Sequence, residues 1–565
     1  MTNKLKTIEK PCTVQTQQGF SVLYKDRYLY SRYAPSAAII KFIENLTLLP
    51  DTLILCYAPA LGYGLRELIE KMPPGCHILT VDFDKQLYDF FREKWICANS
   101  SLADDKRISS VLLASPAEIA KILNDGKFVP PPGSFKRAAI VKMSGGTAFC
   151  EEAYTEVTEY ADNFIQTFWK NHITLTRMGR MYALDVLKNL KMIEFASCSA
   201  HNCGGHANLE YINNIQFLQL YSVSKPILVI GAGLSTDNLL PALYAPNNDF
   251  FILCVDAALP ALLQNGIRPD AVVAVESQLA IEKAYIGAAE SGIHVIADLT
   301  SRPRVTRLCG GNVSFFLSEY CTLPFMKELT NAARSLGIPV FPPLGSVGLY
   351  AVEIALYLRK PGTPVFVCGL DFSFVPGQTH CKGAPAHTAS LVTADRLRPA
   401  GTPAAAYNHT AHPIVGKTGR TEYTDAALSG YGALYAKRYQ KVSNLFDCAV
   451  SGMQSGIQGI SRYAMFSLIE SLCDYEEATE PIFAAPAASQ PECRYVENQL
   501  KKLSRIKAIL TGSEEPRSDT ELEELIAECG YLYAHFPDCA AGFRMTQDFL
   551  NRIRAEVDVF LKAGQ

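Results

Sequence analysis

Residues 225–240, KPILVIGAGLSTDNLL, combine a short apolar run, a glycine turn and the start of a helix. The apolar run predicts a buried strand at 226–230, because short uninterrupted apolar segments bounded by turns are typical of parallel sheets. Gly231 and Gly233 remove the Cβ atoms that would keep a ligand away from the backbone. Ser235 favours a helix N-terminus, whose free N–H groups attract an anion.

This turn has neither of the two common phosphate-binding patterns. It lacks the third glycine of GxGxxG and the lysine of GxxxxGK[ST]. The turn therefore favours a nucleotide monophosphate over a triphosphate or a dinucleotide. The alternative is a strand–helix connection that binds nothing.

The same alternation of strands and helices continues through the centre of the chain. Helices are expected at AALPALLQNGI, which Gly266 ends, and at SVGLYAVEIALYLRK. Further strands are expected at FFILCVD (250–256), DAVVAVES (270–277), HVIADL (294–299), VSFFL (313–317) and TPVFVCGLD (363–371). This order predicts a mostly parallel sheet covered by helices on both faces.

Three acidic residues, Asp256, Glu276 and Asp371, stand at the predicted carboxyl ends of strands. Ligands of open parallel sheets bind beyond these ends. The carboxylates are therefore candidates for binding ribose hydroxyls, base amines or a metal ion. For Asp256 the alternative is capping of the helix that follows it.

The segment VCGLDFSFVPGQTHCKGAPAH (367–387) is the richest in candidate catalytic groups. Gly369 and Asp371 close a predicted strand, and a glycine loop then presents Thr379 and His380. A histidine held over a sheet edge is a candidate general base because its pKa lies near neutrality. The alternative is a loop histidine in solvent.

A second place for an anion is predicted at PPLGSVGLYAVEIALYL (342–358). Gly345 and Ser346 open a long apolar helix, with Ser346 as the cap. Two helix N-termini facing one crevice would suit the phosphate of a nucleotide. The alternative is a capped core helix without a ligand.

Three regions are expected: 1–200, 201–464 and 465–565. The first joins a β-hairpin or meander, a Rossmann-like domain and a helical linker. There Asp82 follows Gly62 by about twenty residues, as the ribose-binding acid of nucleotide folds does, although a ligand-free domain fits equally well. The third region has the apolar spacing of amphipathic helices.

Composition limits the classes of function. Hydrophobic residues make up 48% of 565 residues and the net charge is −3, which argues against nucleic-acid or anionic-membrane partners. We expect neither a signal peptide nor a membrane span. Seventeen scattered cysteines without a CxxC pair suggest reduced thiols in a cytosolic protein. Cys198, His201, Cys203 and His206 have the side chains of a zinc site, but their spacing is cramped for a single tetrahedral ion.

In their order, the segments ILVIGAGLS, CVDAALPALLQNGIRPDAVVAVES, GSVGLYAVEIALYL and VFVCGLDFSFVPGQTHCKG resemble the motility-associated factor (Maf) family of flagellin glycosyltransferases. The central domain resembles the MptE-like 6-hydroxymethylpterin diphosphokinases as well. Gly369, Asp371, Thr379 and His380 fit the family pattern as they stand. Leu234 replaces the usual proline of the turn, Thr236 its usual leucine, and Glu276 the usual aspartate.

The resemblance implies a fold of two Rossmann-like, doubly wound domains, the central one sialyltransferase-like, followed by a helical region. It implies transfer of a nonulosonic acid, of pseudaminic or legionaminic type, from a CMP-activated donor to serine or threonine of flagellin in the cytoplasm. His380 and Asp371 would be catalytic. The donor would contact Gly231, Gly233, Ser235, Asp256, Glu276, Gly345, Ser346, Gly369 and Thr379.

Two other functions stay open. An MptE-like diphosphokinase would transfer diphosphate from ATP to a pterin alcohol and would need Mg²⁺, held by acids such as Asp256 and Glu276. A non-catalytic flagellin-binding scaffold would keep a decayed nucleotide site, in keeping with Leu234 and Glu276. For the transferase no cofactor beyond the donor is named, and a role for Mg²⁺ is left open.

Overall fold

The computed structural model describes residues 10–96, 105–199, 215–244, 250–397, 399–400, 410–471, 483–484 and 494–564. The chain divides into two compact units. Unit 1 comprises Met1–Arg177 and Tyr533–Phe549, and unit 2 comprises Met178–Leu532 and Leu550–Gln565. Both units thus take residues from the C-terminal part of the chain. The expected three-domain boundaries stay a prediction.

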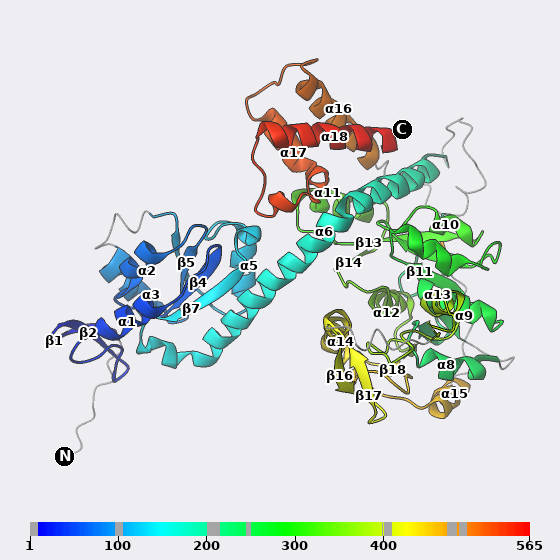
Figure 1. Ribbon diagram of the computed structural model, residues 1–565, viewed down its shortest axis with the longest axis horizontal. Coiled ribbons are helices and arrows are strands. Elements are labelled where there is room, and N and C mark those ends of the chain that lie inside the picture. The colour runs from blue at the N-terminus through cyan, green and yellow to red at the C-terminus, as the bar shows by residue number, and fades with distance from the viewer. Residues whose placement is uncertain are drawn as a thin grey trace. The chain divides into compact units, whose positions relative to one another are not determined.

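Unit 1 is built on a parallel sheet with the strand order β6-β5-β4-β7 (Figure 1). Its strands are β4 (Thr52–Tyr57), β5 (His77–Asp82), β6 (Ile108–Leu112) and β7 (Arg137–Lys142). All three pairings are parallel. The first strand in the chain lies beside the last, which is the order of half a doubly wound fold.

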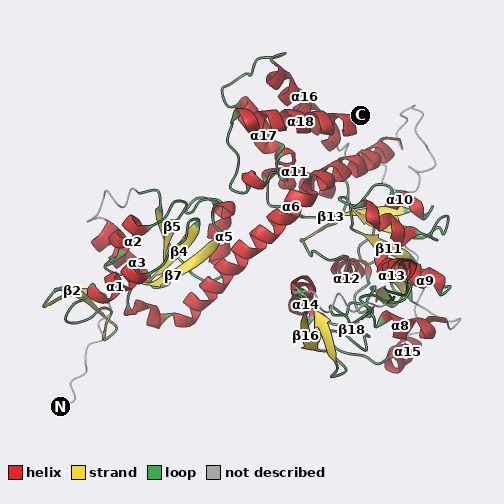
Figure 2. Cartoon of the chain, in the orientation of Figure 1, coloured by secondary structure: helices red, strands yellow, loops and turns green. Residues whose placement is uncertain are grey.

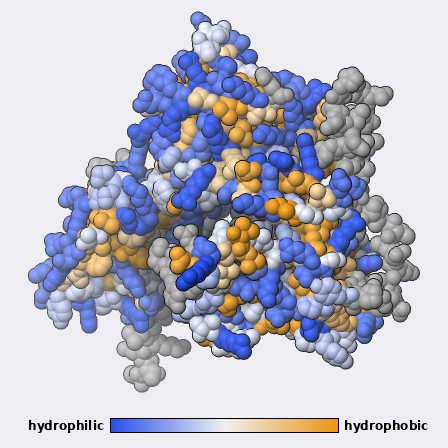
Figure 3. Space-filling view, turned by 45° about the vertical axis from the view of Figure 1, so that its right-hand side comes forward, coloured by the Kyte–Doolittle hydropathy of each residue, from blue (hydrophilic) through white to orange (hydrophobic). Residues whose placement is uncertain are grey.

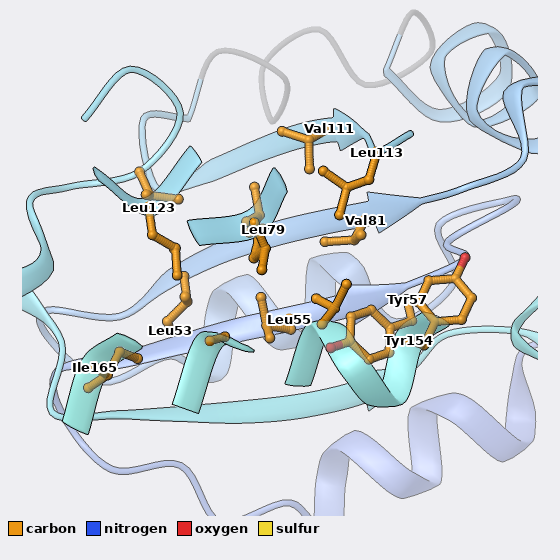
Figure 4. Close-up of a cluster of buried hydrophobic side chains, with 14 of the residues drawn as sticks. Leu53, Leu55, Tyr57, Leu79, Val81, Val111, Leu113, Leu123, Tyr154 and Ile165 are labelled. Carbon is orange, nitrogen blue, oxygen red and sulfur yellow. The ribbon is translucent and has the colours of Figure 1, made fainter. Parts of the chain in front are cut away.

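The alternating residues of β4, TLILCY, face two different helix layers. Leu53 and Leu55 pack with α5 (Glu118–Asp125) and with the first turns of α6 (Glu151–Ser199), as Figure 4 shows. Ile54 and Cys56 pack on the other face with α1 (Ala37–Asn45), α2 (Leu65–Lys71) and α3 (Lys85–Phe91). Burial on both faces explains why this strand is an uninterrupted apolar run.

An antiparallel meander precedes this sheet, as predicted. It consists of β1 (Cys12–Thr16), β2 (Gly19–Tyr24) and β3 (Arg27–Tyr28). Its inward side chains, with Tyr30, form a small core with Ala60, Leu87 and Phe90 of the following domain. The meander therefore packs on the sheet domain and does not stand apart from it.

Unit 2 contains a parallel sheet with the order β14-β13-β12-β11-β10-β9-β15-β18 among the described residues. Figure 2 colours the strands yellow and the helices red. Its strands are β9 (Ile227–Ile230), β10 (Phe251–Val255), β11 (Ala271–Ala274), β12 (His294–Asp298), β13 (Val313–Ser318), β14 (Val340–Phe341), β15 (Val365–Cys368) and β18 (Leu445–Asp447). The chain moves outward from β9 in one direction and then returns to its other side with β15. The topological switch point therefore lies beside β9.

Helices cover this sheet. The most apolar, α12 (Val347–Leu358), packs against β9, β10, β11 and β15. Other elements are α8 (Thr236–Leu239), α9 (Leu259–Gln264), α10 (Val305–Leu308), α11 (Pro324–Ser335), α13 (Pro385–Val392), α14 (Ala426–Tyr439), α15 (Arg462–Glu470), α16 (Tyr495–Thr511), α17 (Glu521–Glu528), α18 (Gln547–Gly564), and the antiparallel pairs β16 (His412–Val415) with β17 (Thr421–Thr424) and β8 (Phe217–Leu218) with β19 (Phe483–Ala484). The predicted α/β fold class with parallel sheets is confirmed.

The surface carries both hydrophilic and hydrophobic side chains. On the face that Figure 3 draws, hydrophilic side chains surround the apolar ones, which is ordinary for a globular protein. Among the described helices, none has the length and apolar content needed to cross a bilayer. All cysteines with described side chains are free thiols.

Candidate active site

A cavity of about 530 Å³ opens at the carboxyl edge of the unit 2 sheet, at its switch point. Ala232 and Gly233 line it from the loop after β9, and Val255 and Ala257 from the end of β10. The other walls come from the loop after β15, the N-terminus of α12, the loop that carries His380 and the start of α14. Doubly wound sheets bind their ligands at this place.

Gly231 and Gly233, the two glycines of the turn after β9, let the backbone of this turn contact the loop after β15. The N–H of Gly231 donates to the carbonyl of Cys368 at 2.8 Å, and that of Gly233 donates to Gly369 at 2.8 Å. A Cβ on Gly231 would lie 2.3 Å from the carbonyl oxygen of Gly369. The glycines thus let the loop after β15 approach the turn, and both N–H groups are already used.

Ser235 binds the carboxylate of Asp371 with both of its donors. Its backbone N–H donates to Oδ2 at 2.8 Å, and its hydroxyl donates to Oδ1. The same hydroxyl accepts the N–H of Gly369 at 2.9 Å. The donors of Ser235 thus bind the chain's own carboxylate, and the donor contacts expected of Gly231, Gly233 and Ser235 stay a prediction.

Asp371 is 3% exposed, and burial raises its pKa to about 6. Because both of its oxygens face Ser235, its visible role is to join the loop after β15 to the glycine turn. Its predicted role as a catalytic carboxylate stays a prediction, although it lies in the wall of the cavity.

The second predicted anion-binding place, at the N-terminus of α12, faces the cavity with backbone N–H groups that no described residue accepts. Gly345 adopts a left-handed φ of +70° next to Tyr431, and α12 begins two residues later. Ser346, Val347 and Gly348 line the cavity, and Ser346 makes no side-chain capping bond. Among the described residues, none accepts the N–H of Val347 or Gly348. These groups and the positive end of the α12 dipole can bind an anion.

The loop that carries His380 is fastened to the glycine turn and the short helix after it. The N–H of Cys381 donates to the carbonyl of Ala232 at 2.9 Å, and the N–H of Lys382 donates to Asp237 at 2.9 Å. Gln378 donates to the other oxygen of Asp237 at 2.9 Å. These bonds fix the position of the histidine at the cavity.

His380 is half-buried and lines the cavity. Its Nδ1 lies 3.0 Å from the hydroxyl of Thr379. Burial lowers the pKa of the ring below its usual value of 6.5, so the ring is neutral at neutral pH. A neutral imidazole can accept a proton from a substrate hydroxyl.

The three strand-end acids do not converge. Asp256 is buried, its Oδ1 accepts the N–H of Ala257 at 2.7 Å, and burial raises its pKa to about 7. It lines neither this cavity nor the next. Glu276 follows β11 by two residues and lines a second cavity of about 270 Å³. The predicted donor contacts of both acids are thus not placed in the main cavity.

Sequence reasoning missed the wall formed by α14. Asp425 caps this helix by accepting the N–H groups of Ala427 and Leu428 at 2.9 and 2.8 Å. Asp425, Ala427 and Tyr431 all line the cavity. The start of α14 could have been predicted, because an aspartate directly before AALSGYGALYAKRY is typical of a helix N-cap.

Buried ionic groups support the cavity floor. Glu422 accepts the hydroxyl of Ser373 and the N–H of Gly452. Lys417, which is half-buried, forms an ion pair at 2.6 Å with the buried Asp447. Glu422 of β17 therefore joins the loop after β15 to the loop after β18.

The glycine loop of unit 1 is packed by protein. Gly62 has a φ of +69°, and a Cβ there would lie 2.2 Å from the Trp95 ring. Tyr30 of the meander donates to the carbonyl of Pro59 at 2.7 Å and accepts the N–H of Leu61 at 3.1 Å. These contacts favour the ligand-free alternative for this domain.

Neither metal prediction gains support. Among the described residues, no group of three or more His, Cys, Asp or Glu could hold a metal ion. The zinc ligands considered at Cys198, His201, Cys203 and His206 lie outside the residues whose side chains are described.

Comparisons with known proteins agree with this architecture. Residues 205–377 match the family described as 6-hydroxymethylpterin diphosphokinase MptE-like. A protein of Treponema pallidum (strain Nichols), described as uncharacterized, is 31% identical over 571 residues, covering 98% of this chain and 94% of its own. The structure of a MAf glycosyltransferase from Magnetospirillum magneticum AMB-1 aligns with a TM-score of 0.53 at 15% identity, over 98% of this chain and 91% of that one.

The structural match extends over nearly the whole chain. At 15% identity it establishes a shared fold, and the MptE-like match covers the strands that build the main cavity. The resemblance to the Maf family with an MptE-like central domain is thereby confirmed for the fold and for that domain.

Proposed function

Because this chain belongs to the family of the Treponema pallidum relative and contains an MptE-like domain within a Maf-type fold, we propose that it is a glycosyltransferase. The proposed donor is a CMP-activated nonulosonic acid, and the proposed acceptor is a serine or threonine hydroxyl of flagellin. The proposed place of action is the cytoplasm, before flagellin is exported.

One observation carries the proposal: the switch-point cavity combines an unused helix N-terminus with a neutral histidine. Its volume of about 530 Å³ lies within the range of small-molecule sites. Among the described residues of its lining, none is lysine or arginine. The N–H groups at Val347 and Gly348 therefore supply the positive potential, which suits the single phosphate of CMP better than a triphosphate.

The proposed reaction follows from these groups. The bond between the sugar's anomeric carbon and the CMP phosphate breaks, and the phosphate oxygen keeps the electron pair. The N-terminus of α12 stabilises the charge on that oxygen. The acceptor hydroxyl forms the new bond while Nε2 of His380 takes its proton. Thr379 at Nδ1 orients the ring.

The test is an assay with purified full-length chain, CMP-nonulosonic acid and unmodified flagellin, read by intact mass. His380→Ala should lower the transfer rate about 10²- to 10⁴-fold while CMP binding persists. His412→Ala, an exposed histidine outside the cavity lining, is the matched control. An unchanged flagellin mass with the wild-type chain would refute the proposal.

The dependence on pH provides a second readout. His380 must be neutral to act as a base, and burial holds its pKa below 6.5. The value of kcat/KM should therefore rise with pH and level off, with its acid limb below pH 6.5. An acid limb above pH 7 would contradict the assignment of His380.

The alternative function is diphosphoryl transfer from ATP, which the description of the MptE-like family favours. It would predict Mg²⁺-dependent ATP binding, whereas the proposed transferase binds CMP. The buried position of Asp256 weighs against a shared Mg²⁺ site with Glu276. A flagellin-binding scaffold would bind CMP or flagellin without transfer, so the mass assay separates all three.

A further inference from the structure

A second cavity adjoins the main one. It measures about 270 Å³ and is lined by Ala257, Glu276, Gln278, Ile281, Ala284 and His380, among others. Ala257 and His380 line both cavities. His380 thus borders both spaces, which is the position that a base needs to take the proton of an acceptor hydroxyl beside the donor.

The two cavities differ in the groups that they offer to an anion. In the main cavity, Ser235 occupies both oxygens of Asp371, Asp425 keeps Oδ1 on the N–H groups of Ala427 and Leu428, and the N-terminus of α12 adds unused N–H groups and positive potential. In the second, Glu276 keeps one oxygen, Oε1, on the N–H groups of Ser277 and Gln278 at 3.0 Å. No described residue donates to its other oxygen, Oε2.

This difference favours the sugar nucleotide in the main cavity and the polypeptide in the second cavity. A sugar nucleotide with a phosphate and a sugar carboxylate is repelled by Glu276 and attracted by α12. The remaining walls of the second cavity are mostly alanine, isoleucine and proline side chains, and its volume suits one or two amino-acid side chains. Oε2 of Glu276 can accept an N–H of a polypeptide backbone or of a neutral or basic side chain.

We infer that the second cavity is the acceptor subsite: it takes a serine or threonine of a polypeptide, orients its hydroxyl toward His380, and selects against acidic neighbours through Glu276. This inference rests on the proposed transferase function. Glu276 is a specificity residue here and takes no part in bond making.

Two substitutions on α13 test whether the acceptor binds in the second cavity. Ala386 is exposed and lines the second cavity, whereas Ala389 is exposed on the same helix outside the lining. Ala386→Trp should raise the KM for the acceptor at least about tenfold, with unchanged CMP affinity and unchanged slow hydrolysis of the donor by water. Ala389→Trp should match the wild type in all three. An unchanged acceptor KM, or an equal loss of CMP affinity, in Ala386→Trp would overturn the inference.

Glu276→Gln tests the selectivity, because the amide oxygen keeps the two N–H bonds. The substrates are serine peptides that differ only in an Asp or an Asn beside the serine. The wild type should discriminate against the Asp peptide by about tenfold in KM, and the variant should lose most of this ratio. Equal ratios in both proteins would overturn the inference. A wild-type chain that binds no CMP would instead refute the proposed function itself.

Discussion

The two parallel sheets of this chain each place a glycine turn after the first strand, yet the turns end in different surroundings. In unit 1 the turn after β4 is packed by Trp95 and by Tyr30 of the meander. In unit 2 the turn after β9 packs against the loop after β15 and leaves a cavity of about 530 Å³ beside it. A glycine turn after the first strand is therefore found both at a sheet edge that protein side chains fill and at a sheet edge that has a cavity.

The meander reaches several loops at the carboxyl edge of the unit 1 sheet. Besides Tyr30, its Lys25 forms an ion pair with Asp84 at 2.7 Å, and the carbonyl of Leu29 accepts the N–H of Gly145 at 2.8 Å. These loops follow β5 and β7. A glycine turn permits close approach, and distant packing decides whether protein or ligand approaches.

The largest effect is expected from filling the turn of unit 2. Gly231→Ala should lower the free energy of unfolding by about 3 kcal/mol, because its Cβ would overlap the carbonyl of Gly369. Gly266→Ala is the control: its φ is +70° but nothing lies within 4 Å, so about 1 kcal/mol is expected. Chemical denaturation measures both, and equal losses would contradict the close approach.

In unit 1, Asp82 occupies the sequence position of a ribose-binding acid. It is 1% exposed, its Oδ2 has no partner among the described residues, and burial raises its pKa to about 7. The unfolded state, with a pKa near 3.9, loses its proton first, so this carboxyl lowers stability progressively as pH rises from about 4 to 7.

Asp82→Asn should therefore stabilise the chain relative to the wild type more at pH 8 than at pH 5, by about 2 kcal/mol. Thermal or chemical unfolding at the two pH values measures the difference. A variant that is less stable than the wild type by an equal amount at both pH values would show that the carboxylate is ionised and satisfied, as a ligand-binding acid would be.

The smallest effect is expected at the meander contact. Tyr30→Phe removes the hydroxyl that joins Pro59 and Leu61 and should cost about 1 kcal/mol of stability. It should leave CMP binding and transfer unchanged, because the cavity belongs to the other sheet. A loss of CMP affinity in Tyr30→Phe would place the nucleotide in unit 1 and contradict a filled turn there.

Much of the fold could be predicted, because apolar runs and caps are local. The strands at 226–230 and 363–371 and the helix that starts after Ser346 lie where they were expected. Short strands without an apolar run, such as β14 and β18, were not predicted. The helix α18 lies within 465–565, the region that was expected to be helical.

The candidate site was predicted in part. Ser346, Gly233, Gly369, Thr379 and His380 line one cavity because the parallel order brings their loops to one edge. Two features could not be predicted from local sequence patterns, because they depend on residues far apart in the chain. They are the hydrogen bonds from Ser235 to Asp371 and the packing of Tyr30 against the glycine turn of unit 1.

Isothermal titration of CMP into a matched pair of variants tests whether the switch-point cavity holds the nucleotide. Ala427 lines the cavity and Ala426 does not, and both are exposed at the start of α14. If CMP binds in this cavity, Ala427→Trp should weaken CMP binding about tenfold or more, while Ala426→Trp should bind CMP like the wild type. Equal affinity in both variants, or no CMP binding by the wild type, would contradict it.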